Sequence, residues 1–332
     1  MIGYILSVSE KPDFCTQKTI KQKKRKNMNI LIIAEKRVQV KQYIDALTEK
    51  GQTVNYIRVS KITLVSKQNE TLIKSLGEEV EAYDAVFIQT RTSLAPFIEP
   101  LLEELEAINS YTNIKKGSYF TGWNEPYQFV TLALANIPTP KTITTASIKN
   151  IEQFSKKISY PILINTYIGK KNQQSLVINS NRELNGFVKS IKTEIDGFMI
   201  REFIEGNIIS SIVVGKKTFA VKRNYNGEEV EKIKEGKYYV MTENENETAI
   251  NAAKACGYDI ARVDMIKGKI IKVTPMFLLE DFNNICSVKI EDYVADFLIE
   301  MAKKHENKVK APIDFLSLKK LIGKTILKGL LK

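Results

Sequence analysis

Two charged side chains in the segment 258–275 are the best candidates for chemistry in this chain. Asp264 and Lys272 each lie in a short apolar run, and a Lys-Gly-Lys turn at 267–269 separates the two runs. Strand-forming residues on both sides of such a turn predict a β-hairpin. A carboxylate buried on a strand is costly unless a cation lies against it. The functional question is whether this cation is a metal ion or the Lys272 ammonium.

The length and composition predict a folded protein of two or three domains. The chain has 332 residues, of which 43% are hydrophobic, so it can bury sizeable cores. Its net charge is +12, but the lysines and arginines crowd the two ends and leave the middle closer to balanced. We therefore expect no sequence-specific binding of nucleic acid by the central part.

The cysteines, the histidine and the apolar runs exclude several kinds of site. The three cysteines lie far apart without metal-ligand spacing, which suits a reducing cytoplasm. The single histidine, His305, excludes a multi-histidine zinc site and argues against a Ser-His-Asp triad. No apolar run reaches the ~18–20 residues that cross a membrane, and residues 1–9 lack the features of a secretory signal. We expect a soluble cytoplasmic protein.

Both ends of the chain are basic, and each leaves alternatives open. Residues 1–27 end in KQKKRKN without periodicity, so we expect a disordered leader, or an upstream start with Met28 as the working initiator. A contact with nucleic acid or a membrane is the alternative. Residues 306–332 are predicted to form a basic amphipathic helix that packs on its own domain or a second subunit, docks on a partner, or lies on an anionic membrane surface. Its apolar face is expected to contain Phe315, Leu318, Ile322, Ile326 and Leu330.

From Met28 onward, strands and helices are predicted to alternate. Strands are expected at 28–37, 54–57 and 83–88, and helices at 40–47 and 97–105. This pattern predicts a small doubly wound α/β domain over 28–118. The domain contains no glycine-rich phosphate loop, so we do not expect it to bind a dinucleotide in the Rossmann manner.

The following part of the chain is predicted to form two α+β subdomains, 119–198 and 199–305. In the first, strands are expected at 161–165 and 176–178, with a helix over 183–190. In the second, strands are expected at 198–204, 208–214 and 218–223, and a helix over 247–256 leads into the hairpin at 258–275.

The order of these elements resembles the RimK-like branch of the ATP-grasp superfamily over residues 28 to about 305. The motifs that carry the resemblance are IPTPKT at 137–142, YPILI at 160–164, MIREFIEG at 199–206, SIVVGKKTFAVKR at 211–223, ARVDMI at 261–266 and IIKVTP at 270–275. No single motif is specific, but their shared order and spacing cover most of the chain.

The resemblance implies a three-subdomain ATP-grasp architecture and ATP-dependent ligation of a carboxylate to an amine, such as the addition of glutamate to an acceptor. It places Glu202, Phe203 and Ile204 against the adenine of ATP. It places Gly169 in the loop over the phosphates and Asp264 among the magnesium ligands. In this family, lysines hold the phosphates and magnesium lies against the β- and γ-phosphate oxygens, where transfer builds charge.

Several positions depart from the pattern of the family. A phosphate-binding lysine is expected where Glu125 stands, and another where Asn165 stands. The second metal carboxylate falls on Lys272, and the loop over the phosphates keeps only Gly169 of its glycines. Further departures are Thr274 in place of an asparagine of the metal site, and Ile208 and Ser210 in place of an aspartate and an arginine.

Replacing a metal carboxylate by lysine changes a site by two charge units. Two like unit charges ~4 Å apart repel each other by about 4 kcal/mol at an effective dielectric constant of 20. We therefore do not expect magnesium-dependent acyl-phosphate chemistry at this site. The simplest interpretation of Asp264 and Lys272 is an ion pair across the hairpin; the alternative is that Lys272 takes the place of the metal and contacts a phosphate. Glu125 is interpreted as a solvated acid in the first turn of a helix, and Asn165 as a polar residue at a strand end.

Three functional interpretations follow. The first is a degenerate relative of the RimK-like glutamate ligases that keeps the cleft, binds ATP, and catalyses weakly or not at all. Such a protein would serve an active ATP-grasp paralogue or an acceptor protein as a partner, and a homo-oligomer is also possible. The second is an active carboxylate–amine ligase with a rebuilt site. The third is a scaffold or regulator that binds a partner or an anionic surface through its basic ends.

Overall fold

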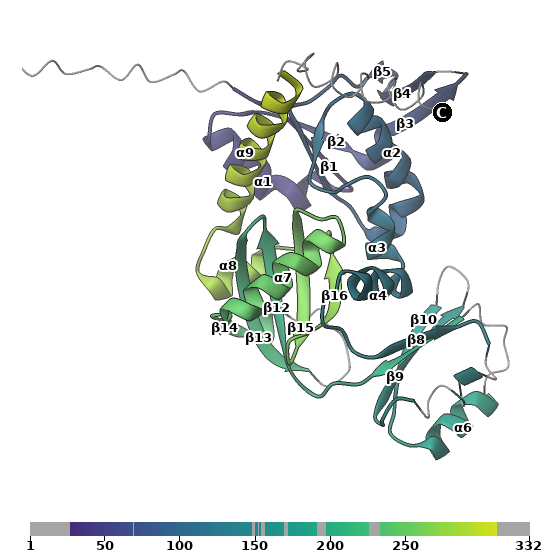
Figure 1. Cartoon of the computed structure of the whole chain (residues 1–332). Helices are drawn as coiled ribbons and strands as arrows, with labels where there is room; N and C mark the ends of the chain where they lie inside the picture. The colour runs from purple at the N-terminus through teal and green to yellow at the C-terminus, as the bar shows by residue number, and fades with distance from the viewer. Residues whose placement is uncertain are drawn as a thin grey trace, which may run out of the picture.

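The computed structural model describes residues 27–310, except 69, 148–149, 152, 154–156, 169–171, 191–196 and 226–232. The predicted leader, apart from its last residue, and the predicted tail beyond 310 lie outside the described residues. Figure 1 shows three units along the chain, each built around its own main sheet. The structure confirms the predicted mixture of α/β and α+β architecture.

The first unit is a parallel sheet between helices. Its strands lie in the order β2-β1-β6-β7, and β1 pairs in parallel with both β2 and β6. The runs of isoleucine and valine bury both faces of these strands, one face against α2 and the other against α1. The bounds are β1 Asn29–Ala34, β2 Thr53–Arg58, β6 Ala85–Gln89, β7 Tyr111–Thr112, α1 Lys41–Glu49 and α2 Ala95–Ala107.

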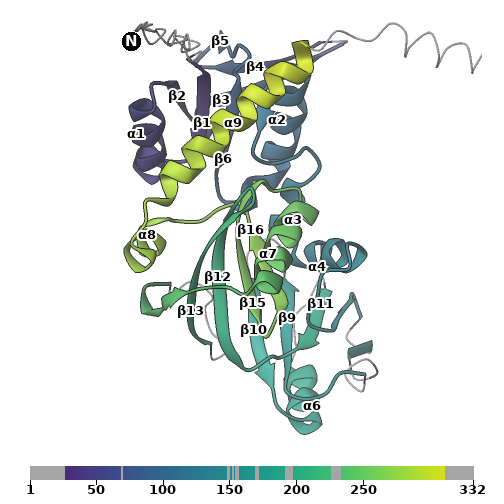
Figure 2. The same ribbon diagram turned by 60° about the vertical axis from the view of Figure 1, so that its left-hand side comes forward.

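Helix α9 (Ile290–Lys310) returns from the far end of the sequence to this first sheet. Its residues Val294, Leu298 and Ala302 recur every fourth position and share a core with β1 and α1. Figure 2 shows α9 crossing β1 and β6. The expected boundary between 305 and 306 falls inside this helix. The helix that follows the third sheet therefore completes the core of the first.

The segment 62–79 forms a small antiparallel sheet that the sequence pattern did not predict. Its strands are β3 (Ile62–Lys67), β4 (Glu70–Ser75) and β5 (Glu78–Glu79). Polar residues dominate these strands, so the apolar signal that reveals a strand is weak here. Residues of β3 and β4 nevertheless reach the core beside α2.

The second unit is the antiparallel sheet β10-β9-β11-β8, which α6 accompanies. It has its own small core of residues such as Ile164, Leu184 and Phe198. The expected division between 198 and 199 falls within β11. The bounds are β8 Thr142–Thr145, β9 Ile162–Ile168, β10 Asn172–Ile178, β11 Gly197–Glu202 and α6 Asn181–Ser190.

The third unit is the antiparallel sheet β14-β13-β12-β15-β16. Helix α7 (Glu243–Ala255) begins at a capping box between Thr242 and Glu245 and covers one face of the sheet. The other face carries the charged residues described below. The bounds are β12 Gly206–Val214, β13 Lys217–Tyr225, β14 Lys237–Tyr239, β15 Ile260–Ile266, β16 Lys269–Thr274 and α8 Glu280–Cys286.

Helices α3 (Tyr119–Trp123) and α4 (Glu125–Leu134) follow the first unit in the chain and pack against both the first and the third unit. The buried hydroxyl of Tyr258 lies 2.6 Å from Thr121 Oγ1 and donates to the Ser118 carbonyl. A Cβ at Gly122 would stand 2.9 Å from the Tyr258 hydroxyl oxygen, so only glycine allows this close approach. Within the described ranges, no helix is long and apolar enough to span a bilayer.

Candidate functional site

Asp264 forms a buried ion pair with Arg262 on strand β15. The Arg262 Nε donates to Asp264 Oδ1 at 3.0 Å, and the Asp264 side chain is fully buried. Lys272 lies opposite Asp264 in the strand register, but the described part of the chain contains no ion pair between them. The predicted pair of Asp264 with Lys272 is therefore wrong. Residues two apart on a strand share one face, so Arg262 reaches the carboxylate along its own strand.

Strand β12 pairs with β15 on the side away from β16, and there Ser210 lies directly opposite Asp264. Ser210 is also fully buried. Within the described residues, neither Ser210 Oγ nor Asp264 Oδ2 has a hydrogen-bond partner. Few buried polar atoms in folded proteins lack partners. These two atoms can therefore still bind a water molecule or a polar group of a ligand.

Three arginines, which we call the arginine group, lie on or against the third sheet: Arg262 on β15, Arg223 on β13, and Arg201, which contacts the Ile271 carbonyl of β16. Each has a relative exposure of 9% or less. Arg223 lies opposite Ile208 on β12, and Ile208 lies opposite Ile266 on β15, so Arg223 shares the face of Asp264. Burial lowers the pKa of Arg223, and the positive charge of Arg262 lowers it further, while Asp264 and the exposed Glu235 oppose both effects.

Arg201 joins strand β11 to helix α4 and strand β16. Its Nη1 lies 3.0 Å from Glu125 Oε1 and donates to the Ile271 carbonyl at 3.4 Å. Its guanidinium also lies 5.4 Å from the ring centre of Phe129. One buried guanidinium therefore ties all three elements together.

Glu125 and Asn165, where two phosphate-binding lysines were expected, contact each other. The Asn165 Nδ2 donates to Glu125 Oε2 at 3.0 Å, while Arg201 contacts the other carboxylate oxygen. Asn124 caps α4 and fixes Glu125 at the start of this helix. The interpretation of Glu125 as a solvated acid is wrong, since two side chains hold it. Asn165 is buried within β9 rather than at its end.

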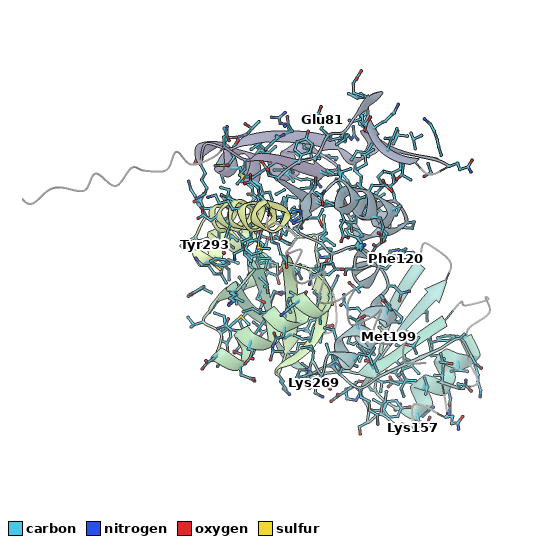
Figure 3. The ribbon with its side chains drawn as sticks, turned by 45° about the horizontal axis from the view of Figure 1, so that its top comes forward. Glu81, Phe120, Lys157, Met199, Lys269 and Tyr293 are labelled. Atoms are coloured by element: carbon cyan, nitrogen blue, oxygen red, sulfur yellow. The ribbon has the colours of Figure 1, made fainter. Side chains whose placement is uncertain are left out.

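A pocket of about 340 Å³ lies where the second and third sheets meet. It is lined by Pro161, Glu202, Phe203, Ile204, Glu205, Lys267 and Lys269. Lys269 Nζ lies 2.7 Å from Glu202 Oε2. This hydrogen bond is the main reason that the pKa of Glu202 lies below its ordinary value, and the backbone N–H of Lys141 acts in the same direction. Figure 3 labels Lys269 on the third sheet and Met199 on the second.

The structure brings the predicted site residues together only in part. Glu202, Phe203 and Ile204 line the pocket, and Lys272 and Asp264 lie on the adjacent strand pair. Gly169 lies outside the described residues.

The residues present do not fit a magnesium ion at the expected position. Magnesium takes oxygen ligands, usually one or two carboxylates with substrate phosphates. Here the retained carboxylate, Asp264, is engaged by Arg262, and its neighbour across the ladder is Lys272. Among the described residues, no three acidic, histidine or cysteine side chains cluster as metal ligands would.

The arginine group was not predicted from the sequence. Arg201 and Arg262 each stand in a strand run whose only other charged residue is an acid, as in MIREFI and ARVDMI, whereas Arg223 follows Lys222 in TFAVKRNY. A charged residue in such a run is itself a signal of a buried polar site. The spacing of Arg262 and Asp264, two residues apart, could have shown that they share a face.

The sequence model of the RimK-like ATP-grasp domain family matches residues 127–304 of this chain, which is more than half of its length. The chain belongs to the RimK-like ATP-grasp family. This match confirms the resemblance found in the motifs. It extends from helix α4 into helix α9 and includes the pocket, the arginine group and the strand pair of Asp264.

Similar curated proteins are divergent in sequence. A probable alpha-L-glutamate ligase of Vibrio atlanticus (strain LGP32) is 22% identical over 274 residues, which cover 79% of this chain and 91% of that protein. A probable alpha-L-glutamate ligase of Coxiella burnetii (strain Dugway 5J108-111) is 23% identical over 272 residues, covering 78% and 90%.

Solved structures confirm the ATP-grasp architecture. The ATP-grasp ligase PsnB complexed with precursor peptide PsnA2 and AMPPNP has a TM-score of 0.62 and 13% identity, covering 83% of this chain and 97% of that one. The RimK domain protein ATP-grasp from Sphaerobacter thermophilus DSM 20745 has a TM-score of 0.59 and 14% identity, covering 81% and 99%. At these identities the likeness shows the fold.

Proposed function

We propose that this protein binds an adenine nucleotide between its second and third sheets and does not carry out magnesium-dependent ligation there. The buried pair of Asp264 and Arg262 carries this proposal. The carboxylate that matches a metal ligand of the family already has a guanidinium 3.0 Å away. A metal ion would have to displace this arginine and then bind opposite Lys272.

The pocket at Glu202 to Glu205 supports the nucleotide half of the proposal. Phe203 and Ile204 offer it an apolar wall, and the charged side chains of Glu202, Lys267 and Lys269 border that wall. Adenine is planar and largely apolar with a polar edge, so it suits such a wall. PsnB, which shares this fold, has been solved with AMPPNP and with magnesium and ADP.

We propose that the nucleotide-bound protein acts on a peptide or protein partner, either an active ATP-grasp paralogue or an acceptor protein. PsnB has been solved with precursor peptides, and so has the macrocyclase MdnC. A protein that keeps this fold without its metal site could bind such a partner without modifying it.

The pocket is tested by replacing Phe203 with alanine. Phe203 is half-buried beside Tyr225 and can be shortened without opening a core. Loss of its apolar contact should weaken binding of adenosine and AMPPNP about tenfold, as measured by isothermal titration calorimetry. Tyr238→Ala, at an exposed aromatic on β14, is the matched control and should change nothing. The proposal fails if neither ligand binds the wild-type protein.

A rebuilt ligase is the second candidate, because Glu125, Asn165 and Arg201 replace the expected lysines with a connected set rather than with unrelated residues. An active ligase would transfer the γ-phosphoryl group of ATP to a carboxylate and release ADP, and hydroxylamine would trap the acyl phosphate as a hydroxamate with release of phosphate. Because either partner can supply the carboxylate, the trial substrates are free glutamate and a peptide that ends in glutamate. We expect no hydroxamate above the level without protein, with magnesium present. Its formation at a rate that falls in Asp264→Asn would favour the ligase.

A further inference from the structure

The strand pair beside the pocket carries an excess of positive charge in the place expected for a metal. The arginine group and Lys272 supply four cations. The facing carboxylates are Asp264 and Glu125, which are largely buried, and the exposed Glu235, which acts on Arg223. The described residues of this site are therefore suited to an anion.

A β-bulge directs these charges along one face. The register between β15 and β16 shifts between Asp264 and Met265, so that β16 contains one extra residue, Ile271. Lys269 lines the pocket, and Lys272, three residues further, lies opposite Asp264. Three residues of strand span about 10 Å. A ligand held at the pocket can therefore extend along β16 toward Lys272 and the arginines.

A hydroxyl at the same place completes the donor set. Ser210 Oγ is fully buried and has no partner within the described residues. Guanidinium groups bind phosphate oxygens through paired N–H donors, and an ammonium binds them as a point charge. Asp264 Oδ2, also without a partner, would repel a phosphate, and the pairing of its other oxygen with Arg262 reduces this repulsion.

We propose that this face binds the polyphosphate chain of the nucleotide directly through Lys272, Ser210 and the arginine group, with no metal ion between them. The inference rests on the proposed function, because the phosphates are assigned to the nucleotide held by the pocket. Free ATP is then the ligand rather than its magnesium complex. Excess magnesium weakens binding, because it neutralises the phosphates before they reach the cations.

The proposal is tested with sodium tripolyphosphate as the probe, titrated by calorimetry into the full chain in EDTA. Wild type should bind it, and it should displace ATP. Lys272→Glu should weaken tripolyphosphate binding roughly 10- to 100-fold, the range for a lost charged hydrogen bond. If the charge reversal in Lys272→Glu impairs folding, Lys272→Gln serves as the test, because it adds no carboxylate beside Asp264. This variant should weaken tripolyphosphate binding about tenfold.

Lys254→Glu is the matched control. Lys254 is exposed on α7, which covers the opposite face of the same sheet, so this change alters the net charge equally away from the site. Its tripolyphosphate affinity should stay within about twofold of wild type. An equal loss in Lys254→Glu and Lys272→Glu would overturn the proposal.

The two proposals can fail separately. Binding of adenosine without binding of tripolyphosphate in EDTA would overturn the direct phosphate contact and leave the nucleotide pocket. Binding of tripolyphosphate without binding of either adenosine or AMPPNP would support the cationic face and contradict the proposed function. A requirement of magnesium for tripolyphosphate binding would also overturn the inference.

Discussion

Replacing Arg262 with methionine is expected to lower the free energy of unfolding by about 3–5 kcal/mol. The change leaves the Asp264 carboxylate fully buried, without the guanidinium that now lies 3.0 Å from it. Removing one partner of a buried ion pair is costly because the remaining charge has lost both water and its partner. Chemical denaturation of wild type and variant measures the difference.

The double variant Arg262→Met with Asp264→Asn separates this cause from lost packing. Without the buried charge, most of the loss should be recovered, because an amide is far cheaper to bury than an unpaired carboxylate. A loss below about 1 kcal/mol in Arg262→Met alone would contradict the account, since such a value is typical of an exposed ion pair.

Replacing Glu125 with lysine, the residue type expected in the family, is predicted to destabilise the protein by about 2–4 kcal/mol. The new ammonium would meet Arg201, whose Nη1 now lies 3.0 Å from the Glu125 carboxylate. The substitution would also remove the carboxylate oxygen that accepts a hydrogen bond from the Asn165 amide. Restoring one family residue should therefore harm the fold rather than restore the site.

Glu125→Gln is the matched control, because it keeps the acceptor for Asn165 and removes only the charge. It should cost less than half as much as Glu125→Lys. The charge-swapped double variant Glu125→Lys with Arg201→Glu should recover part of the stability, as a double-mutant cycle would show. A fully stable Glu125→Lys variant would mean that the contact with Arg201 does not hold these elements together.

The sequence allowed the hairpin at 258–275 and its buried carboxylate to be predicted, but not the partner of that carboxylate. The alternation of strand residues puts both Arg262 and Lys272 on the face of Asp264. Which cation reaches it depends on side-chain length, on the bulge at β16 and on the packing around Ser210. A pattern of polar and apolar residues contains none of this information.

The cluster of Glu125, Asn165 and Arg201 could not be predicted from the sequence for a different reason. Its members come from α4, β9 and β11, which are distant in the sequence. Each residue alone has an ordinary interpretation, as a helix acid, a strand-end amide or a strand charge. Only the packing of the second sheet against α4 and β16 brings them within hydrogen-bond distance.

Tertiary contacts also decide the elements that were missed or misplaced. The sheet over 62–79 has few apolar residues, and its packing beside α2 stabilises it. The boundary between the second subdomain and the tail helix was placed between 305 and 306, yet helix α9 crosses it and runs from Ile290 to Lys310. The strand that leads into the pocket was predicted over 198–204 and lies at Gly197–Glu202, because the apolar run Phe198–Ile200 marks it.

Calorimetric titration of ATP into the full chain, with magnesium and then with EDTA, tests the central claim most directly. We predict saturable binding in EDTA that is at least as tight as binding with excess magnesium, because Arg262 engages the Asp264 carboxylate and Lys272 lies opposite it. Binding that appears only when magnesium is present would contradict this account and would indicate a metal-dependent site.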